Sequence, residues 1–444
     1  MMAAGFRLMR TSLPARKFIG RILWTVVVCA VFAGASSSPG LAAQAEGASP
    51  PPREYHGKVR TGIDVLEIEK FAPLRTKGRE GPVRIGLITN QTGVDSKGRR
   101  TIDLLAHAEG VKLVAIFSPE HGIEGKLDEE HVASGTDAAT GVRVYSLYGE
   151  TRRPTAEMLQ GIDALVFDIQ DAGVRFFTYV TTMAYAMESA AKAGVRFILL
   201  DRPNPLGGDV VEGPVEDADE LKFTAYFRMP IRYGMTMGEL AKMFNAENKI
   251  GVDLTVVEMQ GWKRGELFEK TGLKWIAPSP NLRTVKETLT YPGLDILQAA
   301  GVSVGRGTET PFEMFGAPWM DGEKVARILT ERQIPGVKFK AVKFTPASDL
   351  YKGQECGGVS VRVTDARYFR PVRMGMEIAE VLWWKYPENF DVEKMMTLVG
   401  SRETVERVRA EKSVDDIEEG WQEGENGFRA MSGKYFIYWL TMVQ

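Results

Sequence analysis

The sequence predicts an α/β fold in which a parallel sheet with crossover helices is followed by a smaller α+β domain. From residue 83 onward, short apolar runs alternate with segments of helical periodicity, which is typical of βαβ units. Polar clusters follow directly after several of these runs. Past residue 275 the pattern changes to turns, a glycine-rich loop, and then strands and helices.

The elements of the first part follow from these patterns in order. A proline at position 119 marks the end of the second strand, because proline cannot continue a ladder. Thr236 and Glu239 form a capping box for the last helix, and Gly194 ends the helix before it. We expect strands at 83–89, 111–117, 142–146, 164–169, 196–200 and 254–258, and helices at 102–108, 156–159, 183–193 and 237–248.

The second part begins where the alternation of strand and helix patterns ends. Residues 278–284 and 291–293 contain proline and glycine and are interpreted as extended or turn elements. We therefore predict a first domain over 61–288 and a second over 289–444. The second is expected to contain strands at 338–345 and 358–363 and helices at 372–386, 392–398 and 402–412.

The N-terminus has the pattern of a secretory signal peptide over residues 1–43. Five basic residues precede an apolar run at 22–35, and small residues follow it. That run is shorter than the roughly 20 residues that span a bilayer core, so we expect no membrane span once the signal is removed. Residues 44–60, rich in Ala, Pro and Gly, are expected to be a flexible linker. The mature protein is therefore expected to be periplasmic or extracellular.

Composition and charge indicate a globular protein and argue against a nucleic-acid partner. The chain is 44% hydrophobic and 26% charged, as globular proteins are. Removing the five positive charges of the signal, which contains no acidic residue, moves the formal net charge from −2 to −7. A nucleic-acid partner is not expected, because binding phosphate requires a basic surface. Cys29 leaves with the signal, so Cys356 has no intrachain partner.

Polar side chains gather at the carboxyl ends of the predicted strands. If the strands are parallel, these ends meet at one edge of the sheet, where α/β proteins bind their ligands. The same edge is expected to receive the turn before the second domain and its glycine-rich loop. The polar residues in these segments are Asn90, Glu120, His121, Asp168, Gln170, Asp171, Arg202, Asn204, Asn281 and Arg306.

Glu120 is the leading candidate for a catalytic residue. It follows the second strand, next to Phe117, Pro119 and Ile123, whose apolar surfaces would raise its pKa. A carboxyl that holds its proton near neutral pH is what glycoside hydrolysis needs for protonating the leaving oxygen. The alternative is that Glu120 only complements a helix dipole.

Glycoside hydrolysis also needs a second catalytic group, and the site needs side chains that bind the substrate. Glu309, in the glycine-rich loop, is a candidate partner for Glu120 if the second domain closes over the pocket. Asp168 and Asp171 either bind sugar hydroxyls, serve as the second carboxylate, or cap a turn. An acidic ligand would be bound by arginines, although each is also a candidate for an ordinary surface ion pair: Arg175, Arg202, Arg283 and Arg306.

Metal and cofactor chemistry receive less support. His121 and Glu124 are three residues apart and share one face if the segment is helical, which suits a metal pair, but no second ligand pattern accompanies them. The glycines at 301–307 lack the spacing of a dinucleotide fingerprint. We expect no cofactor and no metal.

Several motifs together resemble the exo-β-N-acetylmuramidases of the NamZ/YbbC type, from about residue 62 to the C-terminus. They are Gly86-Leu87-Ile88-Thr89-Asn90-Gln91-Thr92-Gly93, Ser118-Pro119-Glu120-His121-Gly122, Asp168-Ile169-Gln170-Asp171 with Gly173 and Arg175, Asp201-Arg202-Pro203-Asn204-Pro205, Pro278-Ser279-Pro280-Asn281 and Gly305-Arg306-Gly307-Thr308-Glu309.

This resemblance implies a Rossmann-like first domain, a smaller second domain and an active cleft between them. It also implies a glycosidase that removes N-acetylmuramic acid from the non-reducing ends of peptidoglycan fragments during cell-wall turnover or recycling. Glu120 is then the catalytic acid, with Glu309, Glu124 or Asp168 as the second group. The alternatives are a non-catalytic binder of cell-wall sugars and a metal-dependent hydrolase on the same fold.

Overall fold

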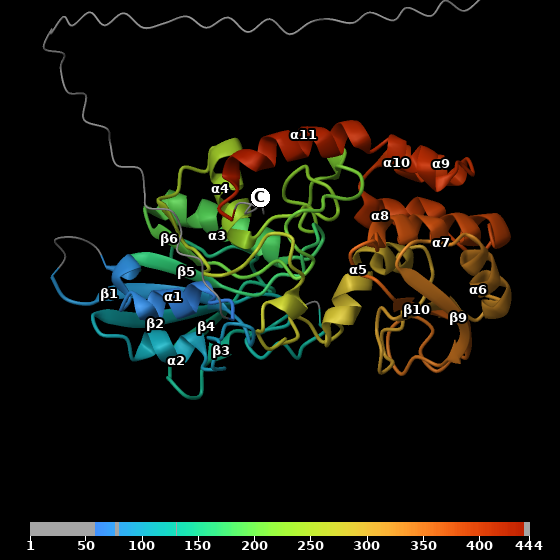
Figure 1. Cartoon of the computed structure of the whole chain (residues 1–444). Coiled ribbons are helices and arrows are strands. Elements are labelled where there is room, and N and C mark those ends of the chain that lie inside the picture. Colours follow the sequence, from blue (N-terminus) through green and yellow to red (C-terminus); the bar gives the residue numbers. More distant parts are fainter. Residues whose placement is uncertain (1–57, 76–79, 130, 439–444) are drawn as a thin grey trace, which may run out of the picture. The chain divides into compact units, whose positions relative to one another are not determined.

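A mostly parallel sheet of seven strands forms the first part of the protein and confirms the predicted α/β fold (Figure 1). The computed structural model describes residues 58–75, 80–129 and 131–438. The strand order is β3-β4-β2-β1-β5-β6-β7, in which the short β3 pairs antiparallel to β4. The strands are β1 Val83–Thr89, β2 Val111–Ser118, β3 Gly135–Thr136, β4 Arg143–Ser146, β5 Ala164–Asp168, β6 Arg196–Leu200 and β7 Leu254–Val257.

The direction in which the chain crosses the sheet reverses between β1 and β5. From β1 the chain passes to β2 and β4 on one side, and it then returns to add β5, β6 and β7 on the other. Loops that leave the strand ends on the two sides of such a reversal diverge and leave a crevice between them. The predicted polar clusters follow these strand ends.

Helices cover both faces of the sheet because the side chains of each strand alternate between the faces. Leu87 and Val166 belong to one buried cluster, which includes residues of α1 and α2. Phe167 and Phe197 belong to the other, which includes residues of α3 and α4 and continues into the C-terminal part. Figure 1 shows the two pairs of helices on opposite sides of the sheet. These helices are α1 Gly62–Ile68, α2 Thr101–Ala106, α3 Tyr179–Ala193 and α4 Met237–Glu247.

The predicted helix signals have different outcomes. The Thr236 hydroxyl accepts from the Glu239 N–H at 3.3 Å and the Glu239 carboxylate accepts from the Thr236 N–H at 3.0 Å, so the capping box is confirmed. Gly194 ends α3 with a φ of 65°, as predicted. The predicted helix at 156–159 is wrong, because these residues form turns. One short segment cannot offset the cost of helix nucleation by itself.

The C-terminal part is α+β, as predicted. A three-stranded antiparallel sheet of order β8-β10-β9 carries helices beside it. Its strands are β8 Met314–Ala317, β9 Val337–Phe344 and β10 Cys356–Val363, and its helices are α6 Gly322–Glu331, α7 Pro371–Lys385, α8 Met396–Val399, α9 Arg402–Arg409, α10 Val414–Glu419 and α11 Gln422–Ser432. Short 3-10 helices are η1 Ala72–Leu74, η2 Ala218–Glu220, η3 Phe268–Lys270, η4 Val392–Met395 and η5 Gly433–Tyr435.

Helix α5, Val285–Gln298, connects the two parts, and the interpretation of 291–293 as a turn is wrong. Pro292 and Gly293 lie inside this helix. A Cβ atom on Gly293 would lie 1.9 Å from the carbonyl oxygen of Pro371, so glycine allows α5 to approach α7 closely. The predicted division after residue 288 falls within α5, and the assignment of two domains over 61–288 and 289–444 stays a prediction.

The predicted signal peptide at 1–43 and the linker residues up to 57 lie outside the described residues. Within the described part of the chain, no helix is both long and apolar enough to cross a membrane.

Candidate active site

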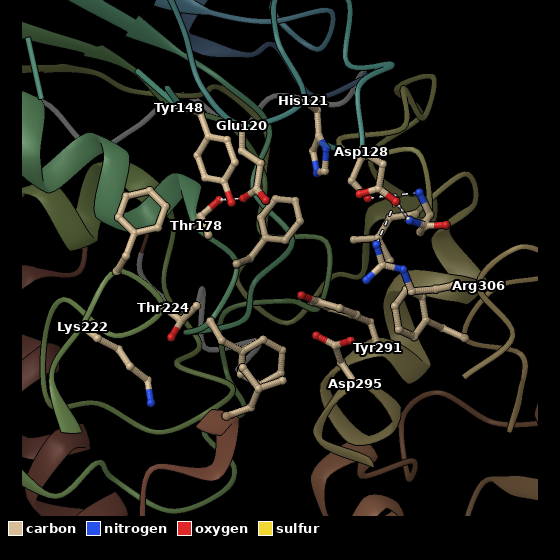
Figure 2. A pocket seen from close by; sticks show the side chains of 18 of the residues that line it. Glu120, His121, Asp128, Tyr148, Thr178, Lys222, Thr224, Tyr291, Asp295 and Arg306 are labelled. Atoms are coloured by element: carbon tan, nitrogen blue, oxygen red, sulfur yellow. Dashed lines mark hydrogen bonds and ion pairs between the residues drawn. The ribbon is translucent and has the colours of Figure 1, made fainter. Parts of the chain in front are cut away.

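A pocket of about 460 Å³ opens at the carboxyl edge of the parallel sheet and is closed on one side by α5 and the loop that contains Arg306 (Figure 2). This volume lies in the range of small-ligand sites. Four of the predicted site residues line it, and they are Glu120, His121, Asn281 and Arg306. The remaining lining residues include cationic and carboxyl side chains that sequence analysis did not assign to the site.

Glu120 comes from the turn that follows β2. Pro119 has no N–H and ends the strand, so the chain turns at the sheet edge. His121 and Gly122 then have φ values of 69° and 74°. A left-handed conformation at a residue other than glycine costs of order 1 kcal/mol and is concentrated at functional sites. The turn places Glu120 and His121 side by side on the wall of the pocket.

Two neighbours fix the side chains of this turn. The Thr178 hydroxyl, at the N-terminus of α3, donates a hydrogen bond to the Glu120 carboxyl. The His121 Nδ1 lies 2.6 Å from the carbonyl oxygen of Leu127, and because a carbonyl only accepts, Nδ1 carries a proton. The N-terminus of α3 thus orients the Glu120 carboxyl through Thr178.

Asp128 and Arg306 form the polar wall next to His121. The Asp128 Oδ2 accepts from Arg306 Nη2 at 2.8 Å and from Asn281 Nδ2 at 3.1 Å. Burial opposes ionisation of Asp128, but the charge of Arg306 and these hydrogen bonds outweigh it and lower the pKa. Arg306 Nε also lies 2.9 Å from Asp349, so two carboxylates neutralise its charge.

Asp295 and Tyr291 enter the pocket from α5. Figure 2 shows both on the side opposite Glu120. Burial raises the pKa of Asp295 to about 6, although Arg306 and a hydrogen bond with Tyr291 act in the other direction. The pocket therefore contains a carboxyl that titrates near neutral pH and a second carboxyl, Glu120, across from it.

Two further cationic side chains, Arg152 and Lys222, line the pocket. The Arg152 guanidinium stacks on Phe223, 4.2 Å from the ring centroid, and lies 5.3 Å from the centroid of Tyr148. Lys222 is nearby along the lining, and its ammonium lies 3.4 Å from a Glu220 oxygen. Figure 2 shows Lys222 far from the wall that carries Arg306.

Most of the other predicted residues lie below the pocket rather than in it. They are buried and hold the loops at the sheet edge together: Asn90, Asp168, Gln170, Asp171, Arg175, Arg202 and Asn204. Arg175 illustrates this arrangement, because its guanidinium donates to the carbonyl oxygens of Pro214, Met229, Leu398 and Val399. It contacts main chain from both parts of the protein instead of a ligand.

The hydrogen bonds of the other buried residues lead to the same conclusion. Asn90 donates to the Tyr179 hydroxyl at 3.0 Å. Gln170 donates to the carbonyl oxygen of Pro203 at 2.8 Å, and Asn204 accepts from the Leu206 N–H at 2.9 Å. Asp171 accepts from the hydroxyl of Tyr233, and burial raises the pKa of Asp171 to about 6. Asp168 is paired with Arg202.

Three further predicted residues lie outside the pocket on the surface. Glu124 is exposed and pairs with Lys126 at 2.7 Å. Glu309 is exposed, and Arg283 donates to the carbonyl oxygen of Thr308 at 2.8 Å. The structure thus brings none of the three candidate partners of Glu120, namely Glu309, Glu124 and Asp168, into the pocket.

Two groups of residues have metal-ligand character, the predicted pair of His121 and Glu124 and a cluster of three carboxylates. His121 and Glu124 point to different partners, since Glu124 pairs with Lys126. In the described part of the chain, Asp64, Glu67 and Asp95 have oxygens within 4.8 Å of one another, but away from the pocket. Arg99 binds both Glu67 and Asp95 there and already supplies a positive charge.

Sequence reasoning missed Asp128, Arg152, Thr178, Lys222 and Asp295. For two of them, the sequence contains a pattern that could have predicted their place in the pocket. Arg152 follows β4 in the same way that Glu120 follows β2, so the strand-end rule applies to it. Asp295 lies four residues after Tyr291, a spacing that places both on one face once the segment is taken as helix.

The fold and the pocket define an α/β protein with a carboxyl-lined ligand site at the ends of its parallel strands. The model of the family described as exo-beta-N-acetylmuramidase NamZ, N-terminal, matches residues 85–286, and that of its C-terminal part matches residues 289–438. The chain belongs to this NamZ family, and the predicted resemblance is confirmed.

Matches to individual proteins support the same family assignment. The peptidoglycan beta-N-acetylmuramidase NamZ of Bacillus subtilis (strain 168) is 41% identical over 385 residues, which cover 86% of this chain and 92% of the relative. Two crystal structures of DUF1343 family proteins from Bacteroides fragilis NCTC 9343 superpose with TM-scores of 0.79 and 0.70, at 38% and 28% identity. Each match covers 86% of this chain and 99% of the solved chain.

Proposed function

We propose that this protein is an exo-acting glycoside hydrolase that releases N-acetylmuramic acid from the non-reducing ends of peptidoglycan fragments. The observation that carries the proposal is the position of Glu120 in the pocket of a chain 41% identical to a peptidoglycan beta-N-acetylmuramidase. The family name gives the reaction, and the pocket supplies a carboxyl where that reaction needs one.

Glu120 acts as the acid that protonates the glycosidic oxygen as the bond from C1 to that oxygen breaks. Thr178 orients the carboxyl, and the buried rings of Phe176 and Phe177 line the pocket beside it. Apolar walls exclude water, which strengthens the interaction between the carboxyl and the charge that develops on the sugar.

Binding the lactyl carboxylate of N-acetylmuramic acid requires a cationic side chain that protein carboxylates do not already neutralise. Arg306 is the predicted arginine that lines the pocket, but Asp128 and Asp349 already neutralise it. Arg152 and Lys222 also line the pocket, and neither forms an ion pair with Asp128 or Asp349. We assign recognition of the lactyl group to Arg152, whose planar guanidinium can bind a carboxylate through two hydrogen bonds.

The cellular setting follows from the same proposal. Peptidoglycan lies outside the cytoplasmic membrane, and the first 43 residues have the pattern of a signal peptide. The protein is then exported, to the periplasm or beyond, and acts in cell-wall turnover or recycling. Fractionation of cells followed by N-terminal sequencing of the mature chain tests this, and a chain that retains its first residues in the cytoplasm contradicts it.

The activity is tested with a chromogenic β-glycoside of N-acetylmuramic acid. Wild-type protein releases the chromophore, and Glu120→Gln, which keeps the shape but cannot supply a proton, loses at least about 100-fold in kcat. Glu124→Gln is the matched control, because this exposed glutamate lies four residues away and outside the pocket. Binding without release by the wild type would identify a non-catalytic sugar-binding protein instead.

A further inference from the structure

Glu120 needs a partner, because glycoside hydrolysis uses one carboxyl to protonate the leaving oxygen and a second to deliver or activate the nucleophile. The carboxyl side chains that line the described pocket are those of Glu120, Asp128 and Asp295. Asp128 is bound by Arg306 and Asn281, and the lowered pKa reflects these contacts. Asp128 therefore holds Arg306 and Asn281 in place and is not our candidate for the carboxyl that acts on C1.

Asp295 is presented to the pocket by a rigid element. Helix α5 passes α7 so closely that Gly293 and Gly375 contact each other through their main chains. This contact leaves little freedom for α5 to shift or rotate. Tyr291 and Asp295, on either side of Gly293, both line the pocket.

Tyr291 is a neighbour of Asp295 whose ring is held in place by other aromatic side chains. Its ring packs edge-on against Phe176, Phe177 and Phe312, with centroid distances of 5.4, 6.1 and 4.9 Å. Its hydroxyl is close enough to Asp295 to lower the pKa of that carboxyl. Figure 2 shows these two residues facing Glu120 across the pocket, so a sugar bound between the walls has one carboxyl on each side.

The geometry points to Asp295 as the second catalytic carboxyl, acting on C1 from the face opposite Glu120. This inference rests on the proposed function. Asp295 supplies an electron pair to C1 directly, or takes a proton from a water molecule whose oxygen bonds to C1. In both cases Glu120 gives its proton to the leaving oxygen. In the first case a water molecule then hydrolyses the ester between C1 and Asp295, and its proton goes to Glu120. In the second case, both carboxyls return to their starting states by exchanging protons with solvent.

The charges around Asp295 set the pH at which it can act. Burial raises the pKa of this carboxyl to about 6, Arg306 and Tyr291 lower it, and the negative charges of Asp349 and Glu120 raise it. Asp295 must be ionised to act, so activity falls as the pH drops below about 6.

The test is Asp295→Asn assayed with the chromogenic N-acetylmuramic acid β-glycoside. We expect kcat to fall about 100- to 10,000-fold with an unchanged unfolding midpoint. Added azide should restore turnover and yield the α-glycosyl azide, because the small anion occupies the face that the carboxyl has vacated. Asp128→Asn is the matched control and should show neither azide rescue nor α-glycosyl azide.

The outcomes separate this inference from the proposed function. If wild type is active but Asp295→Asn keeps near-wild-type kcat, the assignment of Asp295 is overturned and the muramidase function stands. A β-glycosyl azide would place Asp295 on the leaving-group side and overturn the assignment as well. A loss that azide does not relieve, in a folded variant, indicates a structural role. Inactive wild type would contradict the proposed function itself.

Discussion

Arg202 holds the Asp168 carboxylate beneath the pocket through two hydrogen bonds, from Nε to Oδ1 at 2.6 Å and from Nη2 to Oδ2 at 2.9 Å. Asp168 is the last residue of β5, and Arg202 follows the adjacent β6 by two positions. Both side chains are buried, and the Thr101 hydroxyl also donates to Asp168. The pair therefore joins two strand ends at the edge that carries the pocket.

Replacing Asp168 with Asn is expected to destabilise the protein by about 3–5 kcal/mol, since Arg202 is left as a buried charge without its partner. Urea unfolding followed by circular dichroism measures this free energy. Glu124→Gln, which breaks the exposed pair with Lys126, is the control and should leave the unfolding curve unchanged. Equal curves for both variants would show that the buried pair does not stabilise the fold.

Thr178→Val is expected to lower kcat/KM about 10- to 100-fold while the fold stays intact. Valine keeps the shape of threonine but cannot donate to the Glu120 carboxyl. A hydrogen bond to the carboxylate that forms as Glu120 gives up its proton contributes about 1.5–3 kcal/mol. Steady-state kinetics on the chromogenic glycoside measure the loss. Thr178→Ser restores the hydroxyl and should restore most of the rate, so a serine variant as slow as valine would exclude the hydrogen bond as the cause.

Arg152→Ala is expected to raise KM about 10- to 100-fold for N-acetylmuramic acid glycosides, because a charge-assisted contact with the lactyl carboxylate is lost. The N-acetylglucosamine glycoside, which has no lactyl group, should be hydrolysed with the same KM by wild type and variant. Comparing both substrates distinguishes recognition from a general disturbance of the pocket. An equal increase on both would assign Arg152 a packing role against Phe223.

The parts of this fold that were predictable from sequence are those set by local patterns. The short apolar runs of β1 and β6, bounded by turn residues, predicted buried strands, and Pro119 marks where β2 ends. Helix α5 was not predictable in this way, because Pro292-Gly293 is a turn signal. Here the same dipeptide serves a crossing of two helices, in which Gly293 meets the main chain of α7. Tertiary packing overrode the local signal.

The candidate site shows a similar limit. A strand-end position predicts that a side chain reaches the ligand edge, but not whether it turns toward solvent or back into the sheet. Glu120 turns into the pocket, whereas Asp168 and Arg202 turn inward and neutralise each other. Pairing depends on two segments far apart in the sequence. For the same reason Asp295, which lies inside the unrecognised helix α5, was not found.

Asp201 makes the stability of the protein depend on pH. Burial raises the pKa of this carboxyl to about 7, and the nearby charge of Glu239 acts in the same direction. Hydrogen bonds from Thr236 at 2.7 Å, the Gly238 N–H at 2.9 Å and Tyr438 at 2.8 Å lower the pKa but do not outweigh burial. The folded protein thus binds a proton that the unfolded chain, with an ordinary value near 3.8, releases.

Between about pH 4 and pH 7 the folded state holds more protons than the unfolded state, so the free energy of unfolding decreases as the pH rises through this window. One such group contributes a slope of at most about 1.4 kcal/mol per pH unit. Asp201→Asn removes this titration, while the Thr236 and Tyr438 hydroxyls can turn to accept from the amide. Unfolding measured from pH 5 to 8 should be flatter for the variant than for the wild type. A variant with the same slope would show that the pH dependence comes from other buried carboxyls, such as Glu212 and Glu216, whose pKa values burial also raises to about 7.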